Sequence, residues 1–308
     1  MGWIKVSAEE YDHARVKNLG VFHSGAFNAL NAHKVNAVDY WVYKDTKKRF
    51  GIVFGSDNQM VKSPFSSPFG GIEAFTTSVD IEILNRAIQE LIPLYKGSVR
   101  LIIPPAFYGE NLIHYAQNAF LNQGFKLIHY DLNYHFETSD LPHYIERIDR
   151  SARKNLNNSL KSNHDFVLCH TMEEKLQCYD IIKQNRQQRG FPLRLSFDAV
   201  LEMEKLTTVY FNYLTIENQA VAAAICYKVT DQVASVVYWG NLVESAHLRP
   251  MNLLAYKLFH QMNDLKYDII DIGHSTDLGL PNFGLCKFKE NIGCRTSPKV
   301  TLLKSTDE

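Results

Sequence analysis

The chain has 308 residues, with 33 Lys and Arg against 33 Asp and Glu, and therefore a formal charge of +0 at pH 7. This balance argues against a dedicated nucleic-acid-binding protein, whose surface would be basic, and against a charged tail that acts as a tether. Hydrophobic residues make up 45% of the chain and charged residues 21%, values that are typical of globular proteins and that exclude extensive disorder.

The first half is predicted to begin with a strand and two helices and to continue with three strands, the first two as a hairpin. A loop rich in Ser, Pro and Gly, residues 63–71, follows the third strand. Apolar residues at helical spacing predict the next helix, and an all-apolar run predicts a buried strand. The predicted elements are strand 3–6, helices 8–18 and 24–32, strands 37–43, 49–54 and 59–62, helix 80–95, strand 99–103, helix 109–122 and strand 126–136.

The second half is predicted to repeat this order. Its expected elements are strand 166–170, helices 172–186 and 197–206, strands 210–216, 220–229 and 233–239, helix 252–265, strand 267–272, helix 283–291 and strand 299–303. A repeat of about 140 residues indicates a duplicated domain rather than a solenoid. We therefore expect two similar α+β domains, residues 1–138 and 164–308, joined by a basic linking helix within residues 139–163. Each domain should contain a mixed, mostly antiparallel sheet flanked by helices.

The sequence predicts no membrane span, no signal peptide, no disulfide bond and no metal site. The sequence has no run of about 18 apolar residues, so no membrane span is expected, and its first residues lack the apolar core of a signal peptide. The five cysteines form no CxxC pair, which predicts reduced thiols and a cytoplasmic protein. No HExxH, P-loop, GxSxG or zinc-ligand spacing is present, so no metal site is expected.

A motif near the end of the chain is more specific than the order of elements. Asp271-Ile272-Gly273 ends a predicted strand, and after a short gap Phe288-Lys289 lies in a helix that is followed by Gly293. The repeated order of elements resembles the N-acetyltransferase (GNAT) fold. Two such units in tandem, with this motif near the end of the chain, resemble the FemAB-like family of aminoacyl and acyl transferases. The resemblance implies two tandem GNAT-like domains and the transfer of an acetyl, acyl or aminoacyl group to an amine, with the active cleft in residues 164–308.

The start of the helix at residue 252 departs from acetyl-CoA-dependent relatives, which carry Gln/Arg-x-x-Gly-x-Gly/Ala there. Their glycines let backbone N–H groups approach a pyrophosphate, whereas this chain has Asn252 and Leu254 at those positions. Arg249 and Asn252 are the candidate residues for contact with the donor. The missing glycines favour aminoacyl-tRNA, whereas the neutral charge argues against extensive tRNA contact. Acyl-CoA and aminoacyl-tRNA therefore both stay open as co-substrates, and no tightly bound cofactor is expected.

Two residues are predicted to be catalytic. The resemblance implies that Lys289 lies where the carbonyl of the donor binds, and a cation there could stabilise the oxyanion that forms when an amine attacks an ester or thioester. His274 follows an apolar strand and would suit a general base near neutral pH. The alternatives are a surface lysine on an amphipathic helix and a histidine that caps a loop.

The remaining candidates are predicted to bind substrate. Strand alternation sends Tyr238 and Trp239 to opposite faces, so at most one lines the cleft and the other packs in the core. Arg186 and Arg189 could hold a carboxylate or phosphate, or simply complete a helix C-terminus. The other candidates are Asn241, Ser275 and Phe288, together with Ser66 and Ser67 in the 63–71 loop, which could wall the acceptor cleft.

The expected amine acceptor is a small molecule or a cell-envelope precursor, with tRNA as a possible donor carrier and no DNA partner. A second reading also fits the missing glycines. In that reading, the protein keeps the cleft of this scaffold, binds a ligand there and has lost catalysis.

Overall fold

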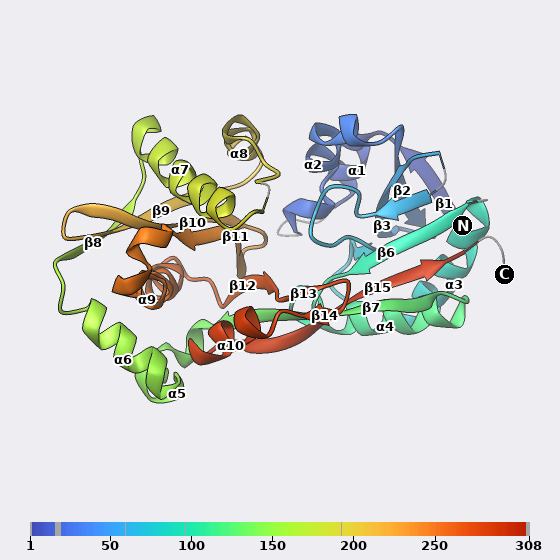
Figure 1. The fold of residues 1–308 in the computed structure, drawn as a ribbon. Helices are drawn as coiled ribbons and strands as arrows, with labels where there is room; N and C mark the ends of the chain where they lie inside the picture. Colours follow the sequence, from blue (N-terminus) through green and yellow to red (C-terminus); the bar gives the residue numbers. More distant parts are fainter. Residues whose placement is uncertain (1, 16–19, 59, 96, 192, 306–308) are drawn as a thin grey trace. The chain divides into compact units, whose positions relative to one another are not determined.

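The computed structural model describes residues 2–15, 20–58, 60–95, 97–191 and 193–305. The chain divides into two compact units (Figure 1), and each is described by itself. Unit 1 comprises Met1–Asn133, Thr276–Pro281 and Ser297–Glu308, and unit 2 comprises Tyr134–Ser275 and Asn282–Thr296. None of the described helices is long and apolar enough to cross a membrane. All five cysteines are buried, and none forms a disulfide.

Unit 1 has the strand order β1-β2-β3-β4-β6-β15-β7, and the short β5 pairs with β3. Residues of β7 and of β15 are shared between the two units. The elements are β1 (Gly2–Val6), α1 (Ala8–Ala14), α2 (Gly25–Leu30), β2 (Ala37–Lys44), β3 (Lys48–Ser56), β4 (Met60–Ser63), β5 (Glu73–Ala74), α3 (Ile81–Leu91), β6 (Ser98–Ile103), α4 (Glu110–Asn122), β7 (Lys126–Glu137), β13 (Thr276–Asp277), β14 (Leu280–Pro281) and β15 (Arg295–Lys304).

The core of unit 1 lies between its sheet and the helix pair α3 and α4. The side chain of Asp80 caps α3 by accepting hydrogen bonds from two backbone N–H groups. The apolar face that the sequence predicts for α3 is confirmed at Leu84, Ala87, Ile88 and Leu91, which are all fully buried. Ile81, at the first turn of the same face, is instead exposed because the helix begins there.

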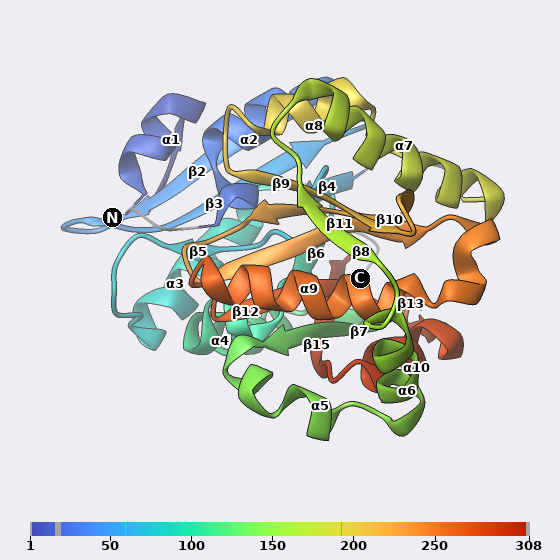
Figure 2. The same ribbon diagram turned by 90° about the vertical axis from the view of Figure 1, so that its left-hand side faces the viewer.

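Unit 2 has the strand order β7-β12-β11-β10-β9-β8. Helices α7 and α9 both pack on the central strands, and they cover opposite faces of the sheet (Figure 2). The elements are α5 (Tyr144–Arg147), α6 (Arg150–Ser159), β8 (His164–Leu168), α7 (Met172–Gln188), α8 (Phe197–Met203), β9 (Val209–Ile216), β10 (Gln219–Lys228), β11 (Val233–Asn241), α9 (Pro250–Asp264), β12 (Ile269–His274) and α10 (Phe283–Asn291). The helices and strands thus follow the predicted α+β order in both halves of the chain.

The structure differs from the prediction in the segment expected to be one linking helix. The backbone is extended at Ile148 and Asp149, which separates α5 from α6. Ile148 is buried, and the Asp149 side chain accepts a hydrogen bond from the Ser151 N–H at the start of α6. This side-chain cap begins a new helix, and the whole segment is part of unit 2 rather than a separate linker.

The last strand also differs from its expected place. β15 pairs antiparallel with β6, with Val300 opposite Ile103 and Leu302 opposite Leu101, so its residues from Ser297 onward belong to unit 1 instead of the second domain. The physical reason is the buried surface of β6, because Leu101 and Ile103 lie in the core and an unpaired strand edge there would leave backbone groups without partners.

The first helix begins as predicted but ends earlier than predicted. The capping box predicted at Ser7 and Glu10 is confirmed by reciprocal hydrogen bonds. The predicted helix 8–18 ends at Ala14, and residues 16–19 lie outside the described residues, as does residue 59 of the predicted strand 59–62.

Candidate active site in unit 2

The candidate site lies where two parallel strands of unit 2 separate. β11 and β12 pair from Val233 opposite Ile269 to Ser235 opposite Asp271, and the register ends there. β11 continues to Asn241 and β12 to His274. The candidates of the second half lie at these two strand ends or on α7, α9 and α10, of which α7 and α9 contact β11 and α10 contacts β12 through Lys289. In unit 1, by contrast, β4 pairs with β6 over its whole length.

A β-bulge changes the direction of the side chains at the end of β11. Ile225 of β10 lies opposite Tyr238 and Cys226 lies opposite Val236, so Val237 is an extra residue. Bulges of this kind redirect side chains and occur often beside active sites. Beyond the bulge, Tyr238 lies under the Arg186 guanidinium, whose carbon is 5.4 Å from the ring centroid. Trp239 instead makes an edge contact with Phe288, with centroids 5.8 Å apart. The two aromatic residues thus have different partners, and both are half-buried, so neither packs fully in the core.

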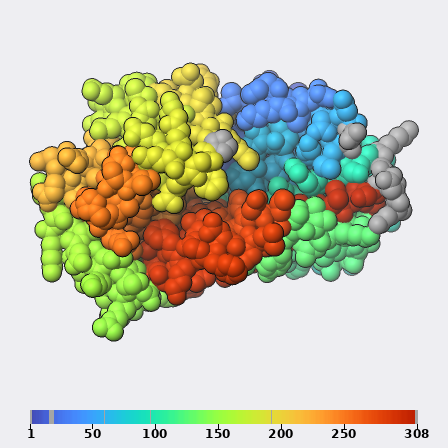
Figure 3. All heavy atoms as spheres, in the orientation of Figure 1, coloured from blue at the N-terminus to red at the C-terminus, as the bar shows by residue number. Residues whose placement is uncertain are grey.

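Lys289 is buried on α10, with only 2% of its surface exposed. Its Nζ donates hydrogen bonds to the carbonyl oxygens of Ile272 (2.9 Å), Gly273 (2.8 Å) and His274 (3.2 Å). An ammonium group has three N–H donors, so three carbonyls match its full donor set. The start of the same helix is exposed, and Figure 3 shows this orange-red segment on the molecular surface, with Phe283 at 79% exposure.

The Asp271-Ile272-Gly273 motif shapes the carbonyl cluster around Lys289. The Gly273 N–H donates to Asp271 Oδ1 at 2.9 Å, and Gly273 has a φ of +72°, in the left-handed region that favours glycine. This conformation breaks the alternation of an extended strand, in which successive carbonyls point to opposite sides. The carbonyls of residues 272, 273 and 274 can therefore converge on one ammonium group.

Tyr134 also lies beside Lys289, and it is not among the residues predicted from the sequence. Lys289 Nζ lies 5.4 Å from the centroid of the Tyr134 ring, within the range of a cation–π interaction. The Tyr134 hydroxyl donates to Glu290 Oε1 at 2.9 Å. Burial, followed by hydrogen bonds to Cys286 and Glu290, raises the pKa of Tyr134, so the phenol stays protonated. The one sequence signal for Tyr134 is the alternation of apolar and polar residues in the predicted strand 126–136. This alternation places Tyr134 and Phe136 on the same face, and both are buried.

His274 and Ser275 follow Gly273 at the end of β12. The His274 side chain is exposed, whereas Ser275 is 2% exposed. The Ser275 carbonyl accepts the Asn282 N–H (2.9 Å) and the Cys286 thiol (3.6 Å). The Ser275 hydroxyl, however, is buried and has no hydrogen-bond partner among the described residues. A buried hydroxyl without a partner is costly, so this position is suited to a bound ligand group or a water molecule.

The C-terminal end of α7 brings further polar groups to the end of β11. Asn185 Nδ2 donates to the Asn241 carbonyl at 2.6 Å, and both residues are buried. The Arg186 guanidinium lies between the rings of Tyr238 and Phe191. Arg189 is exposed at the helix end. Arg186 is therefore held by aromatic contacts, while Arg189 is open to solvent.

The remaining candidates belong to the 63–71 loop and to the start of α9. Ser66 and Ser67 belong to unit 1: the Ser66 hydroxyl bonds Lys34 (2.7 Å) and Asn31 (2.9 Å), and the Ser67 hydroxyl bonds the Phe69 carbonyl (2.8 Å). Arg249 is exposed at the start of α9, with a φ of +53°.

The 63–71 loop, which contains both serines, is anchored within unit 1. The Gly70 N–H donates to the Ile102 carbonyl at 2.8 Å, and Phe69 is buried. At the start of α9, Asn252 is partly buried, and its N–H donates to the Arg249 carbonyl at 3.3 Å.

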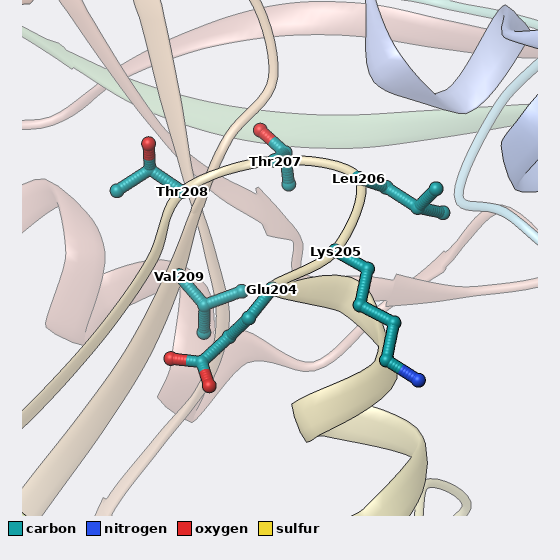
Figure 4. A pocket seen from close by; sticks show the side chains of 6 residues that line it. All are labelled: Glu204, Lys205, Leu206, Thr207, Thr208 and Val209. Atoms are coloured by element: carbon teal, nitrogen blue, oxygen red, sulfur yellow. The ribbon is translucent and has the colours of Figure 1, made fainter.

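A surface hollow of about 510 Å³ lies apart from this site (Figure 4). It is lined by residues 204–209, a single segment between α8 and β9. Val209 of β9 lies opposite Tyr227 of β10, and Tyr227 lies opposite Ser235 of β11. The hollow therefore lies toward the end of the sheet where β11 and β12 are paired. Because one continuous segment forms all of it, the hollow brings no distant groups together, and we assign it no function.

The fold is similar to that of several solved proteins. FemX superposes with a TM-score of 0.69 at 10% identity, over 99% of this chain and 97% of FemX. L-PGS from Bacillus licheniformis gives 0.59 at 10% identity, over 96% of this chain and 90% of that one. A tandem GNAT protein from the clavulanic acid biosynthesis pathway gives 0.50 at 8% identity, over 99% and 98%.

Sequence comparison adds nothing to this likeness, since no protein-family model and no curated protein matches the chain. At such low identities the likeness concerns the fold alone. The chain has an α+β fold of two GNAT-like units, of the type seen in FemX and in tandem GNAT proteins.

Proposed function

We propose that the protein is an N-acyltransferase that moves an acyl or aminoacyl group to an amine at the separated ends of β11 and β12. The observation that carries the proposal is the buried Lys289 beneath the turn that ends β12, in a fold similar to FemX. A lone lysine would not be buried in a helix unless its ammonium group were paired, and here it organises the backbone beside the unpartnered Ser275 hydroxyl.

The proposed reaction forms one bond and breaks another. The nitrogen of a neutral amine attacks the acyl carbonyl carbon, and the C–O bond of an ester or the C–S bond of a thioester breaks when the tetrahedral intermediate collapses. The amine loses one proton to a base, and the leaving alcohol or thiol gains one. His274, exposed at the turn, is the proposed base. Donors aimed at the oxyanion would lower the barrier most.

The polar groups around the site favour substrates with an anionic part. Arg186 contacts two aromatic rings, and Arg189 follows three residues later at the C-terminal end of α7, so a carboxylate or phosphate is the proposed ligand of the pair. Arg249 and Asn252 at the start of α9 are the proposed contacts to the donor. The donor is an acyl-CoA or an aminoacyl-tRNA, and the acceptor is a small molecule or a cell-envelope precursor with a free amine.

The test is a transfer assay with labelled donors. Radiolabelled acetyl-CoA, a long-chain acyl-CoA and a mixture of labelled aminoacyl-tRNAs are each incubated with the protein and a panel of amines. We expect transfer from one donor class and a loss of about 100-fold in Lys289→Ala, with wild-type rates in Lys287→Ala, an exposed position on the same helix. Equal rates in Lys289→Ala and wild type would sink the assignment of Lys289.

A second candidate function is ligand binding without catalysis. The observation that favours it is the start of α9, where Asn252 and Leu254 replace the glycines of acetyl-CoA-dependent relatives. Titration calorimetry with acetyl-CoA, the long-chain acyl-CoA, aminoacyl-tRNA and the panel of amines separates the two candidates. Tight binding of a donor followed by turnover supports the transferase, whereas tight binding of an amine alone supports the second candidate.

A further inference from the structure

We propose that Lys289 acts in the transfer reaction as a positioning residue. Seated on the Tyr134 ring, its ammonium group holds the Gly273–Ser275 turn in one conformation and so fixes the positions of His274 and of the buried Ser275 hydroxyl. This inference rests on the proposed function and deepens it, because it assigns roles to Tyr134 and Gly273 and an indirect role to Lys289.

The first observation is the match between donors and acceptors at Lys289. Its Nζ lies within 3.2 Å of three carbonyl oxygens from consecutive residues, 272 to 274. Hydrogen bonds from an ammonium group are about twice as strong as neutral ones. A substrate oxyanion would have to displace one of these carbonyls to reach Nζ. The geometry therefore favours action through the turn over direct contact with the reacting carbonyl.

The second observation is that the turn depends on the cation. Three carbonyl dipoles that converge on one point repel one another, and a positive charge at that point removes the repulsion. Gly273 allows the convergence through its φ of +72°, and Asp271 fixes the Gly273 N–H. No atom lies within 4 Å of the position that a Cβ on Gly273 would take, so the glycine is required by the backbone angle alone.

The third observation is that the ammonium group is itself held in place. The Tyr134 ring lies beneath it, and the Tyr134 hydroxyl is bound to Glu290, the residue after Lys289 on α10. Tyr134 is fully buried, as is Phe136 two residues later on the same face of β7. The ring therefore offers a fixed support that limits where the Lys289 side chain can lie.

The fourth observation concerns what the turn delivers. The Ser275 carbonyl is occupied by the Asn282 N–H and the Cys286 thiol, which tie the turn to the first residues of α10. The Ser275 hydroxyl is buried and without a partner in the part of the chain that the structure describes. A small rotation of the turn would move this hydroxyl, and a displacement of about 1 Å can cost about 100-fold in rate.

The experiment that tests positioning measures hydrogen–deuterium exchange in the peptide that covers residues 268–281. We expect exchange at residues 273–275 to be at least about 10-fold faster in Lys289→Met and in Tyr134→Leu, since opening of the turn controls exchange. Tyr134→Phe keeps the ring and should stay close to wild type, and Lys287→Met is the matched control on the exposed face. Unchanged exchange in Lys289→Met overturns the proposal.

Kinetics with the donor that reacts in the assay above, whether acetyl-CoA, the long-chain acyl-CoA or aminoacyl-tRNA, add a second readout. If Lys289 acts through the turn, Gly273→Ala lowers kcat by about 100-fold although it retains the ammonium group, and Tyr134→Leu lowers it more than Tyr134→Phe. If Gly273→Ala keeps the wild-type kcat while Lys289→Met loses it, Lys289 contacts the reacting carbonyl directly and positioning is refuted.

The two proposals fail in different ways. Absence of transfer from every donor in the wild-type protein contradicts the proposed function, while the exchange experiment still decides whether Lys289 holds the turn. Should Lys289→Met not fold, Lys289→Arg and Gly273→Ala are measured by exchange in its place. Faster exchange in either supports positioning, and wild-type exchange in both refutes it.

Discussion

At the scale of single residues, the end of β11 leaves no room beside Gly240. A Cβ at this position would lie 2.4 Å from Asn185 Oδ1 and 2.6 Å from its Cγ. Asn185 is buried and donates to the Asn241 carbonyl at 2.6 Å, so its amide has little freedom to move away. The close approach of α7 to β11 therefore requires glycine, and it sets the position of Arg186, the next residue on the helix.

We predict that Gly240→Ala destabilises the protein by about 1–3 kcal/mol, the usual cost of overpacking a buried position. The matched control is Gly284→Ala on α10, where the nearest atom to the new Cβ would be 3.6 Å away. This control should raise stability by about 0.5–1 kcal/mol because alanine favours a helix. Urea unfolding measures the stability of both variants. Equal midpoints for the two variants would contradict the proposed crowding at Gly240.

At the residue scale, the residues that could be selected from the sequence belong to a local motif, and their roles in the reaction stay predictions. Lys289 and Asp271-Ile272-Gly273 could be selected from the sequence, and the structure places them in contact. The role of Tyr134 could not be predicted, because its partner Glu290 is 156 positions away. Its only local signal, burial on an alternating strand, is shared by many aromatic residues.

At the scale of elements, most helices and strands were predictable because periodicity and capping are local. The break between α5 and α6 was missed, although Asp149 with Ser151 two residues on is a recognisable cap. The pairing of β15 with β6 could not be predicted, since periodicity identifies a strand and not its neighbour. Helix α7 is an example of local capping, because both hydrogen bonds of its Thr171–Glu174 capping box are present.

We predict that Thr171→Ala destabilises the protein by about 1 kcal/mol, because the Glu174 N–H at the start of α7 loses its side-chain acceptor. Thr171→Ser should retain most of the stability, since serine can form the same capping box. Thermal unfolding provides the measurement. A Tm of Thr171→Ala equal to that of wild type would show that tertiary packing alone fixes the start of this helix.

At the scale of the whole molecule, three histidines couple folding to pH. Burial lowers the pKa of His23 in unit 1 and of His135 and His260 in unit 2, and nearby carboxylates only partly oppose this effect. These side chains are therefore neutral in the folded protein. In the unfolded chain they bind protons below about pH 6.5, so the unfolded state takes up more protons as the solution becomes acidic.

We predict that stability is constant between about pH 6.5 and 8 and falls as the pH is lowered toward 5, as linkage requires when the folded pKa is depressed. His23→Gln should reduce the slope in this window because it removes one titrating group. Urea midpoints measured at half-unit intervals between pH 5 and 8 give the slope. An identical slope in the variant would show that His23 does not contribute.

The last strand supports a second prediction at this scale. Val300 and Leu302 are buried in the core of unit 1, and burial of two such side chains contributes about 3–6 kcal/mol. A chain truncated after Thr296 should therefore lose cooperative unfolding of unit 1, whereas truncation after Ser305 should leave it intact. Limited proteolysis and thermal unfolding provide the measurement. Protease resistance of residues 1–133 in the shorter chain would contradict this role.

The place of β15 has a consequence for synthesis on the ribosome. The strand neighbouring β6 is made almost 200 residues after β6 itself, and at about 5–20 residues per second this delay lasts roughly 10–40 s. During that time the nascent first unit has an unpaired strand edge beside a buried face, which is a site for mispairing and aggregation. Unit 2 receives its last residues, Asn282–Thr296, before unit 1 does. The unit that begins first in translation is therefore the last to be completed.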